Sequence, residues 1–212
     1  MTIKKRGIKE VRKRIVLLLA VAFLGLLLAG SASASLLYDN GPINGTLNAY
    51  TINYGYSVSD SFTLTGSSSL TGAQVGLWLI QGDSPDSLTW AIGTTVGDSS
   101  LGSGTATLSN TFQFTNGQGY DVYESAFPLS GSLGAGTYWL TLDNAVSNEG
   151  GHVFWDENGG PSQAWQTYMG TRASNSFQIY GETSAVPEPA TLPLLGAGLL
   201  ALGFFGRRFV KA

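Results

Sequence analysis

Glycine, serine, threonine and asparagine interrupt the chain every few residues between Ser35 and Val186, and no helical periodicity is found there. The residues between these breaks are mostly β-branched or aromatic, which are types that favour strands. Short strands with Gly-rich turns at a spacing of roughly 8–12 residues are typical of sandwiches and barrels. We therefore predict an all-β fold, an antiparallel β-sandwich of jelly-roll type.

Alternation with a period of two places the strands and their faces. Val75, Leu77 and Leu79 share one face of a strand, and Trp78 and Ile80 share the other, so we expect this strand to be central and buried on both sides. The predicted strands are Ala49–Asn53, Ser57–Thr65, Gly72–Gln81, Ser87–Thr95, Gly104–Thr115, Tyr120–Leu129, Gly136–Leu142, His152–Asp156, Gln163–Met169 and Ser174–Tyr180.

Aromatic side chains are assigned by the same pattern. Phe112 and Phe114 are two residues apart and are expected to pair on one face of their strand. Trp78 and Trp139 are expected in the core, because large aromatic residues dominate sandwich cores.

The N-terminal 34 residues have the parts of a secretory signal peptide. Seven basic residues precede an apolar run, 15–28, and Ala32-Ser33-Ala34 offers the small residues that a signal peptidase requires. The alternative is a retained anchor, but a run of about 14 residues is short for a bilayer, which needs about 20. We predict a helical signal peptide over 1–34, with cleavage after Ala34.

The C-terminus has three parts in order: Pro187-Glu188-Pro189, the apolar run Leu192–Phe205, and a basic tail with Arg207 and Arg208. The prolines favour extended backbone, which presents Glu188 on an open strand. The apolar run predicts a short transmembrane helix, and the arginines orient it because basic flanks stay in the cytoplasm. The alternative, a buried C-terminal helix of a folded domain, is disfavoured by the prolines.

These three parts together resemble the PEP-CTERM sorting domain, the substrate signal of the exosortase system of Gram-negative bacteria. The resemblance covers about 26 residues at the C-terminus. It implies an exported protein with a cleaved signal peptide, processing near Pro187-Glu188-Pro189 by an exosortase, and an association with exopolysaccharide and biofilm. The expected location is the cell envelope, the cell surface or the extracellular matrix. A cell-wall sortase is disfavoured because the chain has no L-P-x-T-G motif.

The domain plan is therefore a signal peptide (1–34), one β-sandwich body (35–184) and a sorting signal (185–212). The body carries twelve acidic residues and a single full cation, Arg172, for a net charge of −11. Such a surface repels nucleic acid and anionic lipid. The chain has no cysteine, so disulfides, thiol nucleophiles and thiolate metal sites are excluded.

Catalytic patterns are missing from the body. His152 is the only histidine, and no G-x-S-x-G nucleophile motif occurs. Asp156 and Glu157 are adjacent, so in a strand they point to opposite faces and cannot flank one glycosidic bond. We expect a protein that is not an enzyme and has no cofactor.

Two binding hypotheses remain open beside this one. Trp155 and Trp165 have polar and glycine neighbours, and their exposed rings would stack on sugars; core packing is the alternative. Asp156 and Asn158, and also Asp39 with Asn40, resemble part of a calcium loop; an Asx turn is the alternative.

A faint internal repeat links two parts of the body. Tyr38–Pro42, Ala49-Tyr50 and Ser59–Phe62 recur, at nearly the same spacing, as Trp155–Pro161, Ala164-Trp165 and Ser174–Phe177. Two readings are open: equivalent places in two halves of a sandwich, or coincidence in a chain rich in glycine, serine and asparagine.

The sequence thus predicts an exported envelope or matrix protein without catalytic activity. Its expected partners are signal peptidase, an exosortase, exopolysaccharide and, before processing, the membrane, but no nucleic acid. The alternative is a carbohydrate- or calcium-binding module at the cell surface.

Overall fold

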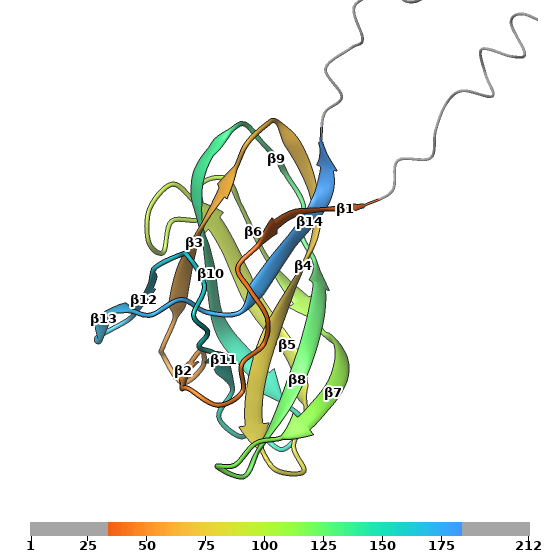
Figure 1. Ribbon diagram of the computed structural model, residues 1–212, viewed down its shortest axis with the longest axis vertical. Helices are drawn as coiled ribbons and strands as arrows, with labels where there is room; N and C mark the ends of the chain where they lie inside the picture. The colour runs from red at the N-terminus through yellow and green to blue at the C-terminus, as the bar shows by residue number, and fades with distance from the viewer. Residues whose placement is uncertain (1–33, 184–212) are drawn as a thin grey trace, which may run out of the picture. The chain divides into compact units, whose positions relative to one another are not determined.

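The computed structural model of the chain describes residues 34–183, which form two antiparallel sheets packed face to face (Figure 1). The predicted all-β antiparallel fold is confirmed. No helix is found in this part of the chain, and so none that could cross a membrane. The helices expected at the two ends fall on residues outside the described range.

One sheet has eight strands, and it carries both ends of the body. Its members are β1 (Ser35–Asp39), β2 (Ala49–Thr51), β4 (Ser68–Ile80), β7 (Ser109–Thr115), β8 (Tyr120–Pro128), β9 (Ser132–Leu133), β11 (Phe154–Asp156) and β14 (Phe177–Thr183). Strand β4 is central, because it pairs with β14 and β11 on one side and with β8 on the other.

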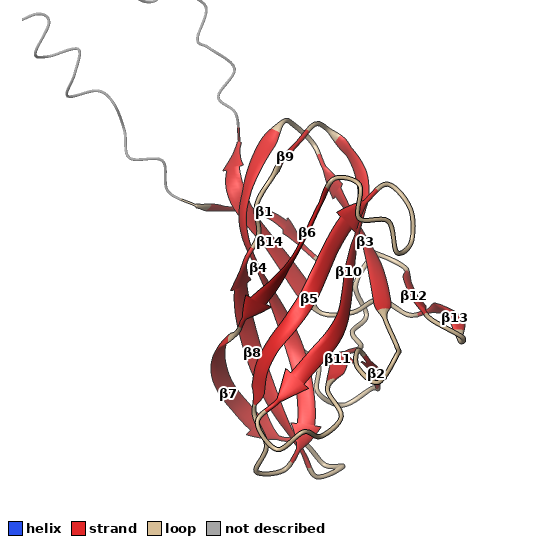
Figure 2. Cartoon of the chain, turned by 180° about the vertical axis from the view of Figure 1, so that it is seen from behind, coloured by secondary structure: helices blue, strands red, loops and turns tan. Residues whose placement is uncertain are grey.

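The second sheet has six strands in the order β13-β12-β3-β10-β5-β6, and Figure 2 shows its long strands in front of the first sheet. Its members are β3 (Val58–Leu64), β5 (Pro85–Gly93), β6 (Gly102–Thr107), β10 (Gly136–Ser147), β12 (Ala164–Gln166) and β13 (Gly170–Arg172).

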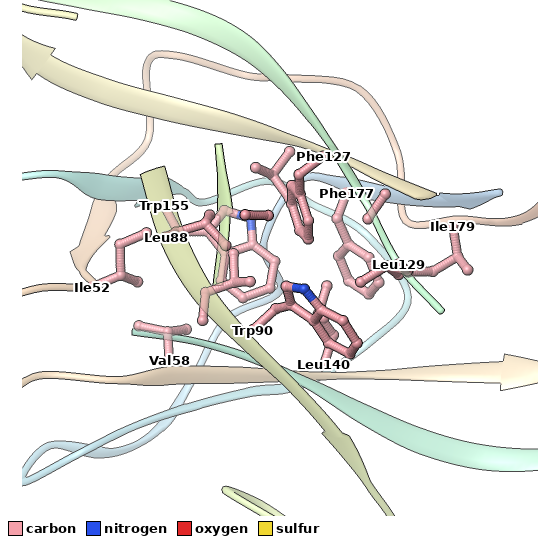
Figure 3. Close-up of a cluster of buried hydrophobic side chains, with 14 of the residues drawn as sticks. Ile52, Val58, Leu88, Trp90, Phe127, Leu129, Leu140, Trp155, Phe177 and Ile179 are labelled. Carbon is pink, nitrogen blue, oxygen red and sulfur yellow. The ribbon is translucent and has the colours of Figure 1, made fainter. Parts of the chain in front are cut away.

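The hydrophobic core lies between the sheets, where alternation directs every second side chain inward. Val75, Leu77 and Leu79 of β4 belong to it as predicted. Figure 3 shows part of this cluster, in which Trp90 and Leu140 come from the six-stranded sheet and Phe177 from the eight-stranded sheet. Burial of this apolar surface is the main force that holds the two sheets together. No disulfide adds to it, because the chain has no cysteine.

The two tryptophans expected in the core differ from each other. Trp78 is buried as predicted, although on the outer face of β4 rather than between the sheets, and Ile80 on the same face is exposed. Trp139 is half-buried on the outer face of β10, because its neighbours Tyr138 and Leu140 take the inward positions. The prediction that β4 is buried on both faces is therefore correct only around Trp78.

The predicted strand Gly104–Thr115 is two strands. The chain breaks at Leu108, whose amide donates to the carbonyl of Asp86, and it passes there from β6 in one sheet to β7 in the other. The short strands β1, β9 and β13 were not predicted, because two to five residues without a full alternation carry little signal.

Candidate functional site

The residues assigned to sorting lie outside the described range, apart from Ala34 at its first position. Those residues are Ala32, Pro187, Glu188, Pro189, Arg207 and Arg208. The described body begins and ends on neighbouring strands, because Ser35 of β1 is paired with Gly181 of β14. Strand β1 starts directly after the predicted cleavage position.

Trp155 is not a sugar-stacking residue. Its side chain is 0 % exposed and lies in the core against Phe177, with a centroid distance of 5.6 Å, and its indole nitrogen donates to the carbonyl of Ser176 at 2.8 Å (Figure 3). The polar neighbours that suggested exposure belong to a buried polar network rather than to a surface loop.

Trp165 does not share a face with Trp155. It lies on β12 in the six-stranded sheet and is half-buried, whereas Trp155 lies on β11 in the eight-stranded sheet. The chain crosses between the sheets in residues 157–163. Trp155 and Trp165 therefore lie on different surfaces although they are close in sequence. The predicted pair of tryptophans therefore does not form one platform.

Asp156 is a structural hydrogen-bond acceptor. Its side chain is 0 % exposed, and its carboxylate accepts from the amides of Asn44 and Gly45 at 2.7 and 2.8 Å and from the indole nitrogen of Trp78 at 2.7 Å. These bonds fix the loop after β1 over the outer face of β4. Burial raises the pKa of Asp156, and the hydrogen bonds partly oppose that rise.

The two asparagines of the calcium hypothesis are also occupied. The Asn158 side-chain nitrogen donates to the carbonyl of Asn40 at 2.7 Å, and its oxygen accepts from the Ser174 hydroxyl at 2.7 Å. The Asn40 side-chain nitrogen donates to Ser174 Oγ and to the Asn175 carbonyl at 2.9 and 2.6 Å. The polar side chains therefore join three loops to one another.

Calcium binding at these residues is expected to be absent, because a cation would have to displace buried N–H donors from Asp156 and Asn158. Millimolar calcium or a chelator should shift the melting temperature of the full-length protein by less than about 1 °C. Thermal melting followed by tryptophan fluorescence measures this. A calcium-dependent rise of several degrees would contradict the expectation.

Asp60 belongs to the same buried network. It is 0 % exposed, and its carboxylate accepts from the amides of Asn175 and Ser61 at 2.6 and 2.7 Å. Burial raises the pKa of this carboxyl group to about 7, against hydrogen bonds from Ser162, Asn175 and Ser61 that lower it. Asp60 is therefore a buried titratable group in a part of the body that supplies no cationic partner.

The two copies of the internal repeat contact each other at this network. Asn158 contacts Asn40, the Asn175 amide contacts Asp60, and the rings of Phe62 and Phe177 lie 6.4 Å apart. Each copy contributes to three strands, two in the eight-stranded sheet and one in the six-stranded sheet, in a different order: β1, β2 and β3 in the first copy, and β11, β12 and β14 in the second, where β3 and β12 are the strands of the six-stranded sheet. The repeated residues therefore form one shared cluster between the sheets.

His152 packs between aromatic rings, with centroid distances of 4.6 Å to Tyr54 and 5.7 Å to Phe154. Within residues 34–183, no group of three acidic or histidine side chains is arranged to hold a metal ion.

A groove of about 330 Å³ lies on the outer face of the eight-stranded sheet, and sequence reasoning did not find it. Strands β4, β14, β8 and β7 supply Gln74, Gln178, Glu124 and Phe114, and the loop after β1 supplies Pro42 on one side. These residues come from five distant parts of the sequence and match no motif.

Phe114 reaches this groove because of a β-bulge. Phe112 is paired with Tyr123 and Phe114 with Val122, so Gln113 is an extra residue between them. An extra residue reverses the faces of the side chains that follow it. Phe112 therefore packs on Tyr123, at a centroid distance of 5.7 Å, while Phe114 lines the outer groove, and the predicted pairing of Phe112 with Phe114 is wrong.

Comparison with known protein families gives a match at the C-terminus. Residues 185–208 match the family model of the PEP-CTERM protein-sorting motif. No curated protein was found to be similar to the chain.

Proposed function

The chain carries a PEP-CTERM protein-sorting motif at residues 185–208, and from this premise we propose that it is a non-catalytic protein of the cell envelope or extracellular matrix. The motif indicates an exported protein of a Gram-negative bacterium that an exosortase processes and sorts. The proposal adds removal of the N-terminal 34 residues by signal peptidase, a transient membrane stop at Leu192–Phe205, and association of the mature body with exopolysaccharide.

The motif match is the observation that carries this proposal. The position of the two processing sites supports it. Strands β1 and β14 are neighbours, and β1 begins at Ser35, so cleavage after Ala34 and near Pro187 removes residues on either side of a complete pair of strands. Both cuts then leave the two sheets whole.

The absence of catalysis is supported by the state of the reactive groups in the described part of the chain. Asp60 and Asp156, the carboxylates most removed from water, accept hydrogen bonds from backbone or indole N–H groups that fix loops. His152 packs against Tyr54 and Phe154. These contacts stabilise the fold, and a structural role for each group supports the proposal.

Replacement of Glu188 by alanine should leave the protein unprocessed and in the membrane fraction, because the carboxylate between the two prolines is the expected recognition element. Intact-mass measurement of tagged protein from the membrane, the envelope and the medium reports both cleavages. The wild type should lack residues 1–34 and the segment after the Pro187-Glu188-Pro189 motif.

The control is Glu182→Ala, which removes a carboxylate at the end of β14, outside the motif, and should mature like the wild type. Normal maturation of Glu188→Ala would refute the recognition role. A wild-type protein that keeps both ends would refute the whole proposal.

A further inference from the structure

We propose that the groove between the loop after β1 and strands β4, β7, β8 and β14 binds an uncharged oligosaccharide. This inference rests on the proposed association of the body with exopolysaccharide and deepens it, because it names the groove and the class of sugar that the body recognises. The groove volume of about 330 Å³ falls at the lower end of the roughly 300–1,000 Å³ of small-molecule sites. Such a space accommodates one or two sugar rings.

The floor of the groove presents amide groups. The Tyr180 hydroxyl lies within hydrogen-bond distance of the side-chain oxygens of both Gln74 and Gln178, at 3.0 Å from Gln74 Oε1. None of the hydrogen bonds among residues 34–183 uses the side-chain nitrogen of Gln74 or Gln178. The hydroxyl has a single proton, so it donates to one of these oxygens, and the other amide turns its NH₂ toward the Tyr180 oxygen. One glutamine therefore keeps both N–H donors for a ligand, and the other keeps one N–H donor and its oxygen.

An acceptor completes the polar set. Glu124 of β8 offers carboxylate oxygens at the same groove. Ser176 also lines it, but its side chain is 1 % exposed and its hydroxyl interacts with the Asp156 carboxylate, so it does not require a ligand.

Phe114 provides the apolar surface. The bulge at Gln113 directs its ring to the groove, where it is 39 % exposed. Gly45 allows the loop to pack against the ring. Its φ of +67° favours glycine, and a Cβ at this position would lie only 2.5 Å from Phe114 Cζ. A fixed aromatic ring can pack against the C–H face of a sugar, and the neighbouring donors and acceptors can bind its hydroxyl groups.

Charge selects the class of sugar. The body has a net charge of −11, its only full cation is Arg172, and the one ionised group in the groove lining is the Glu124 carboxylate. Uronic, sulfated or phosphorylated glycans would be repelled at long range and would meet this carboxylate at the groove. The ligand is therefore a neutral glycan.

The groove has room for more than one sugar unit of a glycan. A second hollow, of about 490 Å³, shares Gln74 with the first and includes Tyr180. Together they follow the outer face across β14, β4 and β8. The floor strand β4 is paired with strands on both sides, so it offers no free backbone edge to an extended peptide. Strand β7 at the rim is paired only with β8 in the described part of the chain, and a peptide probe tests that edge.

Binding is tested by saturation-transfer NMR on the full-length protein in a detergent without a sugar headgroup. The probes are cellotetraose, mannotetraose and chitotetraose, with tetragalacturonic acid as the anionic counterpart and a Gly-Ser-Thr peptide as the polypeptide. We expect at least one neutral tetrasaccharide to bind, and the anionic sugar and the peptide not to. Phe114→Ala and Gln74→Ala should each weaken binding on the order of tenfold.

Phe112→Ala is the matched control, because it removes the same ring from the same strand on the other face, and it should leave affinity within about twofold of the wild type. Circular dichroism verifies that each variant is folded, and Gln74→Ala keeps the test valid if Phe114→Ala loosens the loop. Failure of all three neutral sugars, preference for the anionic sugar or the peptide, or equal losses in Phe112→Ala and Phe114→Ala would overturn the proposal. None of these outcomes depends on exosortase processing.

Discussion

Asp156→Ala is expected to lower the free energy of unfolding by about 3–5 kcal/mol. The substitution leaves three donors without an acceptor: the buried amide of Gly45, the buried indole nitrogen of Trp78 and the part-buried amide of Asn44. Each unsatisfied buried donor costs about 1–3 kcal/mol, and we expect a total near the lower end of the sum because the part-buried Asn44 amide can rehydrate. Urea unfolding of the full-length protein, followed by tryptophan fluorescence, measures the change.

Asp86→Ala is the control for Asp156→Ala. Asp86 lies on β5, its side chain is exposed, and substitutions at such positions usually change stability by less than about 0.5 kcal/mol. A loss in Asp156→Ala no larger than that in Asp86→Ala would show that the carboxylate does not hold the loop after β1. Because this loop forms one side of the groove, Asp156→Ala should also weaken the binding of a ligand in the groove.

The fold was largely predictable from the sequence because alternation is a local property. Leu77 and Leu79 could be placed in the core from their spacing alone, and the strand Tyr120–Leu129 was predicted to within one residue of β8. The bulge at Gln113 was not predictable, because an extra residue follows from pairing with a partner strand. Its consequence was the reversed face of Phe114.

The candidate sites depended on contacts between distant segments, and these contacts could not be predicted from local sequence patterns. Asp156 and Asn158 have the residue types of a calcium loop, but long-range partners such as Asn44 and Asn40 use their polar atoms. Polarity around Trp155 suggested exposure, yet the polar side chains are themselves buried. The sorting motif was found from sequence because it is a contiguous segment that an enzyme recognises without a folded domain.

Stability should fall as pH rises from about 4 to about 7, and Asp60→Asn should remove most of this dependence. The ordinary pKa of this carboxyl group is 3.8, and burial raises it to about 7 in the folded protein. The folded state therefore binds a proton that the unfolded state has lost, so the stabilisation is complete below about pH 4 and is lost through pH 7. A difference of about three pKa units at about 1.4 kcal/mol each gives about 4 kcal/mol.

Urea midpoints of the full-length protein at pH 4 to 8 measure this effect. Burial raises the pKa of Asp156 as well, so the wild-type slope contains a second contribution of the same sign, and the difference between wild type and Asp60→Asn isolates the first. Asp86→Asn removes a carboxylate at the surface and should follow the wild-type profile. Parallel profiles for wild type and Asp60→Asn would mean that Asp60 keeps its charge inside the fold, and that the amides of Asn175 and Ser61 compensate for the lost water.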